Sequence, residues 1–361
     1  MVHILVEENY TNNNRLSVIL NGITCVLKKK RMAIKLHKKM ETIPESTSVV
    51  IVIYASLNWV KETVEKLNEK SVHPILLWVQ DVDTMYKYSG LTFSFTQTMY
   101  QLTKYVLSQQ SPKKEGKSKT AFLGYNDDST PDKLKKRGVA YAVEEAGGEL
   151  VVFKNRGNVG ECIRDFLQNG QDVDTIVCGN DSIAVILRTL YPEALQGRQI
   201  CSCSGLKISQ YVDDPYPTTF IDYYEAGKRL AELYLFINKS ETIAPTVMNL
   251  QMGICVGKEQ LFVDGFPQNS LTDHGQIINY YGDESVKELD NLDRMLLNCD
   301  EMDIKILKGL LEGLSYEQVA ELHYFSANTV KYRVHLMMKN GGGYASKKDL
   351  LAEIEKYGLK F

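Results

Sequence analysis

Short apolar runs alternate with segments of helical periodicity over residues 1–262 of the 361-residue chain. Most of the apolar runs are nearly continuous, which is typical of parallel strands that are buried on both faces. Helical segments between such strands indicate βαβ units, so the pattern predicts an α/β region with parallel sheets. The predicted strands are 2–6, 49–54, 74–79, 120–124, 150–153, 175–178, 199–203 and 247–256. The predicted helices are 15–30, 60–70, 98–108, 133–146, 159–169, 182–190 and 224–238.

This region is too long for one simple sheet, which predicts two lobes. A basic stretch rich in serine and lysine at 111–119 is the expected crossing between them. We therefore expect lobe 1 to comprise residues 1–117 and 222–250, and lobe 2 to comprise residues 118–221 and 251–262.

The pattern changes after residue 262. Turn-forming residues come first, and an acidic segment at 282–297 follows. Residues 263–299 are therefore predicted to be a linker that ends in a helix, and residues 300–361, which hold no strand-like run, an all-helical domain. The acidic segment places four apolar residues at helical spacing, namely Val286, Leu289, Leu292 and Leu296.

Helix starts in this tail share one signature, a short polar residue followed three positions later by a side chain that can reach back to its amide. Only residues 323–325 separate the second predicted helix from the third, so these two helices must pack at a steep angle, as in a helix-turn-helix. The paired residues are Asp300 with Asp303, Ser315 with Gln318 and Ser346 with Asp349, and a related start pairs Ser326 with Thr329. They predict helices over 301–312, 316–322 and 327–339, and a fourth that begins after Ser346.

The third helix of the tail is predicted to be amphipathic, with a basic outer face. Such a helix fits the major groove of DNA, and its charge attracts phosphates. The alternative is a helical bundle whose basic face is merely solvated. The inner positions are Val330, Val334, Met337 and Met338, with Val319 and Leu322 on the helix before it. The outer positions are Asn328, Lys331, Tyr332, His335 and Lys339, and the bases between 326 and 348, a span without acids, are Lys331, Arg333, Lys339, Lys347 and Lys348.

Two segments of the tail, GLSYEQVAEL at 313–322 and SANTVKYRV at 326–334, resemble the LuxR/GerE-type helix-turn-helix family. In that family the third helix reads DNA and the fourth often supports dimerisation. The chain departs from the family pattern at Glu301, at Asp303, and at 341–343, where three glycines predict a flexible connection to the last helix. The resemblance implies DNA contacts at Ser326, Asn328, Thr329, Lys331, Tyr332 and His335, and Lys339 extends the same face.

The larger region resembles the periplasmic-binding-protein-like sensor of the lactose/galactose repressor family. That resemblance implies two Rossmann-like lobes with a ligand between them at the carboxyl ends of the strands, where open α/β sheets place ligands. Repressors of that family carry their helix-turn-helix before the sensor, whereas here a helical domain follows it. The matching segments are 120–124, 133–145 with Gly147 and Gly148, 175–184, 217–222 and 226–232.

The resemblance also implies ligand-binding positions. Asn180 stands at the family's ligand-binding asparagine, and Asp181 beside it is either a second ligand residue or a helix N-cap. Lys135 takes the place of the family's arginine and Asp222 that of its glutamine, and the acid expected after 199–203 is missing. The expected effector is therefore a small polar molecule such as a sugar, but the residues do not specify a sugar. Asn13 and Tyr125 are placed by loop position alone, where loop capping is an equal interpretation.

Composition narrows the class of protein. The chain is 44% apolar and 24% charged, which is typical of a globular protein. A formal net charge of −3 gives no overall attraction to nucleic acid, so DNA binding must depend on a local basic surface. Seven scattered cysteines indicate buried free thiols in a reducing compartment. With no apolar run of membrane-spanning length and no secretion signal at the N-terminus, we expect a cytoplasmic protein without cofactor or metal.

Three other classes of protein fit less well. A phosphoacceptor receiver needs an aspartate at the end of its third strand, where this chain has Ala55 and Ser56. An exported solute-binding protein needs a signal peptide, and an enzyme needs a nucleophile–base pair, a metal cluster or a phosphate loop, none of which the sequence carries. A cytoplasmic sensor whose helical tail mediates protein–protein association stays open as the second interpretation.

The sequence thus predicts a ligand-responsive transcription regulator. A small effector closes the two lobes, and closure changes the geometry of a homodimer, so that paired recognition helices fit or miss two half-sites on DNA.

Overall fold

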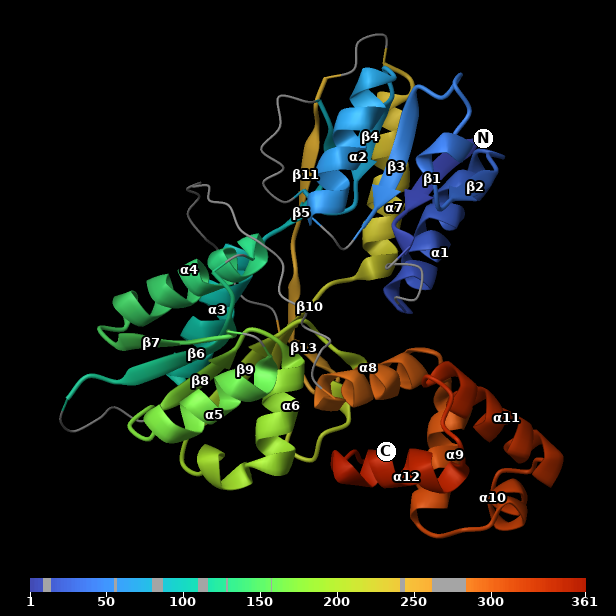
Figure 1. The fold of residues 1–361 in the computed structure, drawn as a ribbon. Helices are drawn as coiled ribbons and strands as arrows, with labels where there is room; N and C mark the ends of the chain where they lie inside the picture. Colours follow the sequence, from blue (N-terminus) through green and yellow to red (C-terminus); the bar gives the residue numbers. More distant parts are fainter. Residues whose placement is uncertain are drawn as a thin grey trace.

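The computed structural model describes two α/β lobes followed by a helical domain (Figure 1). The N-terminus lies in lobe 1, and the C-terminus lies against lobe 2. The fold class predicted from the sequence is confirmed. The described residues are 1–8, 14–54, 57–79, 87–109, 116–127, 129–156, 158–240, 244–261 and 284–361.

Lobe 1 is built on a fully parallel sheet in the order β11-β5-β4-β3-β1-β2. Alternate residues of β3 enter two separate cores, because successive side chains of a strand point to opposite faces. Helices α1 and α7 cover one face and α2 covers the other. The strands are β1 (Val2–Val6), β2 (Ile34–His37), β3 (Val49–Ile53), β4 (His73–Leu76), β5 (Ser89–Phe93) and β11 (Val247–Leu250), and the helices are α1 (Asn14–Lys29), α2 (Leu57–Glu69) and α7 (Tyr223–Ile237), with the short 3-10 helix η2 (Met40–Thr42).

Lobe 2 is built on a sheet in the order β13-β12-β10-β9-β8-β6-β7. Strand β12 pairs antiparallel with both β10 and β13, and all other neighbouring strands pair parallel. Its strands are β6 (Lys119–Tyr125), β7 (Glu149–Lys154), β8 (Thr175–Cys178), β9 (Gln199–Cys203), β10 (Pro217–Phe220), β12 (Gly253–Val256) and β13 (Glu259–Leu261). Its helices are α3 (Phe95–Ser108), α4 (Thr130–Glu145), α5 (Val159–Asn169) and α6 (Asp181–Leu190), with the short 3-10 helices η3 (Pro192–Leu195) and η4 (Lys207–Gln210).

The first crossing between the lobes lies at Ser94, directly after β5, so the predicted crossing at 111–119 is wrong. Helix α3 packs against α4 and against the strands of lobe 2 (Figure 1). Gly138 of α4 permits this approach, since a Cβ there would lie 2.2 Å from the carbonyl oxygen of Thr96. Lobe 1 therefore ends at residue 93 in its first segment. The chain returns to lobe 1 between β10 and α7 and leaves it again between β11 and β12, which divides the predicted strand 247–256 into two strands of different sheets.

The C-terminal helices begin where local capping chemistry predicts. Asp300 with Asp303 and Ser315 with Gln318 form reciprocal capping boxes, and the Ser326 and Ser346 hydroxyls accept from the amides three residues on. All four predicted helix starts are confirmed. The helices are α8 (Glu284–Leu297), α9 (Glu301–Leu311), α10 (Tyr316–Leu322), α11 (Ala327–Asn340) and α12 (Lys347–Lys356).

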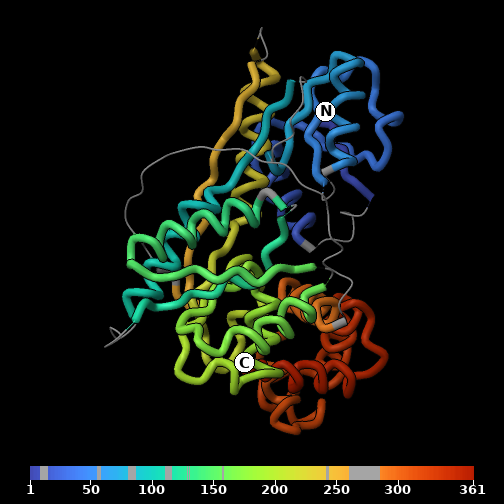
Figure 2. Tube along the Cα trace, turned by 60° about the vertical axis from the view of Figure 1, so that its left-hand side comes forward, coloured from blue at the N-terminus to red at the C-terminus, as the bar shows by residue number. Residues whose placement is uncertain are grey.

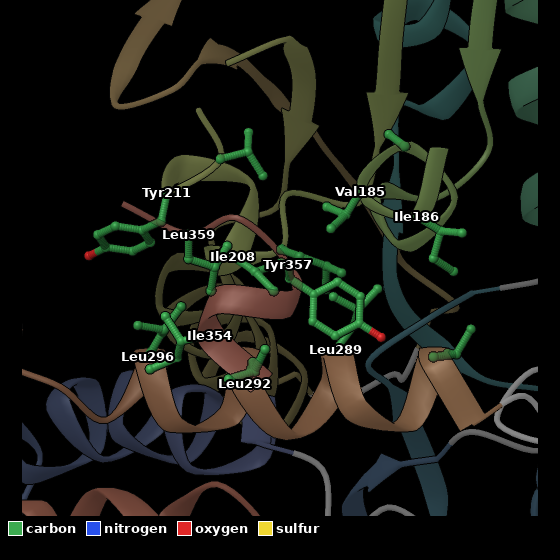
Figure 3. Close-up of a cluster of buried hydrophobic side chains, with 14 of the residues drawn as sticks. Val185, Ile186, Ile208, Tyr211, Leu289, Leu292, Leu296, Ile354, Tyr357 and Leu359 are labelled. Carbon is green, nitrogen blue, oxygen red and sulfur yellow. The ribbon is translucent and has the colours of Figure 1, made fainter. Parts of the chain in front are cut away.

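Helix α8 is part of a core that lobe 2 and the helical domain share, rather than only the end of a linker. Its apolar face packs between α6 and η4 of lobe 2 and the helices α9, α11 and α12 (Figures 2 and 3). The C-terminal strand-like segment adds a second attachment, where Leu359 pairs with Val212 and the Lys360 amide donates to the Tyr211 carbonyl at 2.8 Å. The fully buried α8 residues are Val286, Leu289, Leu292, Met295 and Leu296.

The connection at 341–343, predicted to be flexible, is a turn in which Gly341 and Gly342 lie against α8, while Gly343 is open to solvent. Gly342 and Gly343 have φ values of 91° and 89°, which favour glycine. A Cβ on Gly341 would lie 3.2 Å from Met295 Cβ, and one on Gly342 would lie 2.6 Å from the Asn291 side chain. The glycines therefore bring the chain against α8 and fix where α12 begins.

Two glycines allow α1 and α7 to pack backbone to backbone. A Cβ on Gly227 would lie 2.1 Å from the Ile19 carbonyl oxygen, and one on Gly22 would lie 2.1 Å from the Tyr224 carbonyl oxygen. Because neither backbone can yield, we expect Gly227→Ala to destabilise the protein by about 1 to 3 kcal/mol. Urea unfolding followed by circular dichroism measures the change. Phe236→Ala, on the exposed side of α7, is the control and should change stability by less than about 0.5 kcal/mol; equal stability of wild type and Gly227→Ala would contradict the packing.

Candidate functional sites

The first candidate site lies where β8 ends and α6 begins. Asn180 is the N-cap of α6, and its Oδ1 accepts from the Ser182 amide at 2.9 Å. The Asn180 side chain is half-buried at the carboxyl end of β8. Its Oδ1 holds the helix start, and the cap does not use the amide nitrogen of the side chain.

Asp181 has a structural role, and the interpretation of Asp181 as the N-cap is wrong. It is the first residue of α6 and is fully buried. Its carboxylate accepts from the Leu206 amide at 2.7 Å and from the Thr218 hydroxyl at 2.6 Å. Burial raises the pKa of Asp181 and the two hydrogen bonds lower it in part. Both oxygens are engaged within lobe 2, so Asp181 fixes the loop after β9 relative to β10.

Lys135 of α4 is buried and reaches the same strand end. Its Nζ donates to the Gly179 carbonyl at 2.9 Å and pairs with the Asp132 carboxylate at 3.1 Å. The Phe95 ring lies 5.6 Å from this ammonium group. Burial acts to lower the pKa of Lys135, but the Asp132 carboxylate and other groups outweigh it, so the net shift is upward. Lys135 therefore lies beside Asn180, through its hydrogen bond to the carbonyl of the adjacent Gly179.

The other predicted ligand residues are placed less centrally. Asp222 is the exposed N-cap of α7, where it accepts from the Glu225 amide at 2.8 Å. Tyr125 is buried at the end of β6, with the Lys136 ammonium 4.4 Å from its ring centroid. Burial raises the pKa of the Tyr125 hydroxyl. Asn13 lies outside the described residues.

Sequence reasoning missed an aromatic and cationic group on the lobe 1 side. The Arg15 guanidinium lies 4.8 Å from the Tyr223 ring, whose centroid is 6.2 Å from that of Trp78. Trp78 in turn lies 4.5 Å from Phe93 at the end of β5. Asn155, buried at the end of β7, has a side-chain oxygen without a hydrogen-bond partner among the described residues. The available signal was the position of Trp78, Tyr223 and Asn155 shortly after a strand, which is where parallel sheets place ligand contacts.

The second candidate site is the outer face of α10 and α11. Tyr324 makes the tight turn between them with φ of 58° and is 96% exposed, while the Phe325 amide donates to the Ala320 carbonyl at 2.8 Å. The inward positions Val330, Val334 and Met337 are buried. Leu322 is 58% exposed, so its predicted burial is wrong: α10 ends there, and Phe325 packs against the core instead.

The predicted DNA-contacting residues share one face of α11. Ser326 caps the helix and its hydroxyl also bonds with that of Thr329 at 2.8 Å, so these two residues hold the helix start. The remaining five side chains are exposed, and none is needed for the core. They are Asn328, Lys331, Tyr332, His335 and Lys339.

The basic character of this face comes from lysines and not from Arg333. The Arg333 guanidinium pairs with Asp300 at 2.9 Å and with Asp303 at 2.8 Å, which joins α11 to the start of α9. Its positive charge is thus neutralised internally. Lys331 and Lys347, from different helices, meet around the Tyr316 ring at 6.0 and 4.8 Å, with Glu317 3.7 Å from Lys331. We call Lys331, Lys339, Lys347 and Lys348 the lysine face.

The thiols have no reactive environment. All seven cysteines are free, and five are buried, as predicted. Burial raises the pKa of Cys162 and of Cys255 to about 11. Among the described residues no cluster of three or more metal-binding side chains occurs, and no helix has the length and apolar character to cross a membrane.

The two-lobed fold of this chain is similar to that of solved transcription regulators. A transcriptional regulator CelR–cellobiose complex is similar with a TM-score of 0.57 and 16% identity over 71% of this chain and 83% of that chain. A LacI family transcriptional regulator from Enterococcus faecium with bound ribose has a TM-score of 0.55 and 16% identity over 72% and 97%. The transcription regulator CcpA of Lactococcus lactis has a TM-score of 0.56 and 16% identity over 71% and 97%. No protein-family model and no curated protein sequence matches the chain.

The neighbouring side chains Asn180 and Asp181 should respond differently to truncation. Asp181→Ala leaves the Leu206 amide and the Thr218 hydroxyl buried without their acceptor, so we expect a loss of at least about 2 kcal/mol. Asn180→Ala removes only an N-cap and should cost about 1 kcal/mol. Urea midpoints measure both, and an Asp181→Ala protein as stable as Asn180→Ala would show that the buried carboxylate does not hold the loop.

Proposed function

We propose that this protein is a ligand-responsive transcription regulator that binds DNA through residues 300–361. The observation that carries the proposal is the joint presence of a two-lobed α/β fold and a helical domain in which a short turn joins α10 to α11, whose outer face carries exposed lysines. The short turn at Tyr324 presents α11 away from the lobes, so a duplex can reach the lysine face.

The DNA-binding mode follows from the charge of that face. Lys331 and Lys347, from two helices, both lie near the Tyr316 ring and suit phosphate contacts, while Asn328 and His335 on α11 suit base edges. A homodimer would present two such faces to paired half-sites. We propose that the protein works as such a dimer in the cytoplasm.

Removing one lysine should weaken DNA binding in a salt-dependent manner. We expect Lys331→Ala to lower affinity for a fluorescent random-sequence duplex about tenfold at low salt, and to reduce the slope of log affinity against log salt by about 1. Fluorescence anisotropy over a salt series gives both quantities.

Two control variants separate charge from stability in that experiment. Lys305→Ala removes an exposed lysine of α9 outside the lysine face and should leave both quantities unchanged. Arg333→Ala breaks the pairs with Asp300 and Asp303, so it should lower the unfolding midpoint more than the salt slope. Equal affinity of Lys331→Ala and Lys305→Ala would remove the lysine face from the DNA site.

For the sensor we propose a small polar effector, such as a sugar, bound at Asn180. The support is the half-buried side chain of Asn180 at the carboxyl end of β8, with the Lys135 ammonium group bonded to the carbonyl of the adjacent Gly179. Two proteins of the same fold contain cellobiose and ribose. Asp181 is not part of this proposal, because both of its carboxylate oxygens accept hydrogen bonds within lobe 2.

A thermal-shift measurement with ribose, cellobiose and glucose tests the sensor. A ligand at about one hundred times its dissociation constant stabilises the folded state by about 2.7 kcal/mol, so a binding sugar should raise the melting temperature of the wild type clearly. Asn180→Ala should abolish the shift. Asn158→Ala is the matched control and should retain the shift. Asn158 caps α5 in the same lobe, and its Oδ1 accepts from the Glu161 amide at 2.8 Å. Full retention by Asn180→Ala would exclude Asn180 from the ligand site.

A second candidate function is protein–protein association through the same helices. The observation that favours it is the exposed apolar group beside the lysine face, where Leu322 is 58% and Tyr332 62% exposed. Under this alternative the wild type shows no salt-dependent duplex binding in the anisotropy experiment.

A further inference from the structure

Three consecutive backbone amides of lobe 2 are held by two buried carboxylates from different parts of the molecule. The Leu206 amide donates to Asp181 at 2.7 Å, and the Ile208 amide donates to Oδ1 of Asp293 at 3.1 Å. The Lys207 amide also bonds with Asp293. Asp181 belongs to α6 and Asp293 to α8, and both are almost fully buried. The segment 206–208 therefore bridges the sensor lobe and the helical domain.

The turn that precedes this bridge is rigid. Ser204 has φ of 129° and Gly205 has φ of 59°, in the region that L side chains rarely adopt. A Cβ on Gly205 would lie 2.4 Å from Phe220 Cβ, so β10 presses directly on the turn. A stiff segment held at both ends transmits a displacement of one end to the other instead of absorbing it.

The two ends of the bridge lie at functionally different places. Asp181 follows Asn180 directly, at the candidate effector site. Asp293 is a buried residue in the middle of α8. The apolar residues Leu289, Leu292 and Leu296 of that helix lie beside Ile208 and beside Ile354 of α12 (Figure 3). Helix α8 also contacts α11, which carries the proposed DNA-binding face. A shift of 206–208 is thereby passed to the helix against which α11 rests.

Burial raises the pKa of both carboxylates, that of Asp293 to about 6, and the hydrogen bonds that they accept from the backbone amides lower both pKa values in part.

We propose that residues 206–208, clamped between Asp181 and Asp293, carry the state of the sensor to the helical domain. When the start of α6 moves at the candidate effector site, the hold of Asp181 on the Leu206 amide changes, and the change passes through 206–208 to Asp293 and α8. This proposal rests on the proposed function, because it states how the ligand site regulates the DNA-binding face. It assigns Asp181 and Asp293 as positioning residues.

Hydrogen exchange of the full-length protein, without ligand or DNA, tests the bridge. Thr218→Val removes a donor to Asp181 at nearly constant volume and lies in β10, away from α8. We expect amide exchange to accelerate about tenfold, equivalent to 1.4 kcal/mol, in 206–208 and also in α8 and α11. Acceleration confined to lobe 2, with α8 and α11 at wild-type rates, would overturn the proposal.

Two further variants complete the experiment. Asp293→Asn keeps an oxygen acceptor but removes the charge, so it should accelerate exchange in 206–208 as well as in α8, and it provides the test if Thr218→Val does not fold. Wild-type exchange rates of 206–208 in Asp293→Asn would contradict the clamp. Asn158→Ala, a lost cap elsewhere in lobe 2, should leave α8 unchanged.

The outcome is independent of DNA binding. A wild-type protein that binds no duplex contradicts the proposed function, whereas the exchange pattern still decides whether lobe 2 and α8 are coupled through 206–208. Conversely, salt-dependent duplex binding with exchange changes confined to lobe 2 supports the function and rejects the bridge.

Discussion

The arrangement of the whole molecule depends on the burial of one face of α8. Its five fully buried apolar residues fill a core to which α6 and η4 contribute from one side and α9, α11 and α12 from the other. Because apolar area removed from water contributes about 25 cal/mol per Å², an interface of this kind holds two units together far more firmly than a linker does. The helical domain is therefore a fixed extension of lobe 2, and its orientation is set by packing.

Much of the fold could be predicted because the sequence carries it locally. The strands 175–178 and 199–203 and the helix 159–169 have the predicted bounds, since apolar runs and an Asn cap mark their ends. The four capping pairs of the tail act over three residues, which is the range that sequence reasoning covers best. Strands β2 and β5 were missed because they are short and mixed in polarity, and their place is decided by neighbours in the sheet.

The errors concern contacts between distant residues. The first crossing between the lobes was predicted at 111–119 from composition. Its observed place depends on the packing of α3 against α4, which the close approach of Gly138 to Thr96 permits. The sequence predicts that Arg333 belongs to a basic face, whereas in the structure it forms ion pairs with Asp300 and Asp303. Of the candidate ligand positions, Asn180 and Lys135 converge on one strand end, whereas Asp181 is turned inward by Leu206 and Thr218. No local pattern specifies which oxygen a buried donor will find.

The discontinuity of lobe 1 has a consequence for synthesis of the chain. Its helix α1 packs closely on α7, yet α7 follows β10 and thus emerges from the ribosome only after the parallel strands of lobe 2. Until then the apolar residues Ile19, Ile23 and Leu27 lack the helix that covers them. Domains whose contacts span such a sequence separation fold late and expose apolar surface on the way. Lobe 2, whose strands are closer along the chain, can fold first. The N-terminal part of lobe 1, which is synthesised earlier, then completes its packing when α7 joins it.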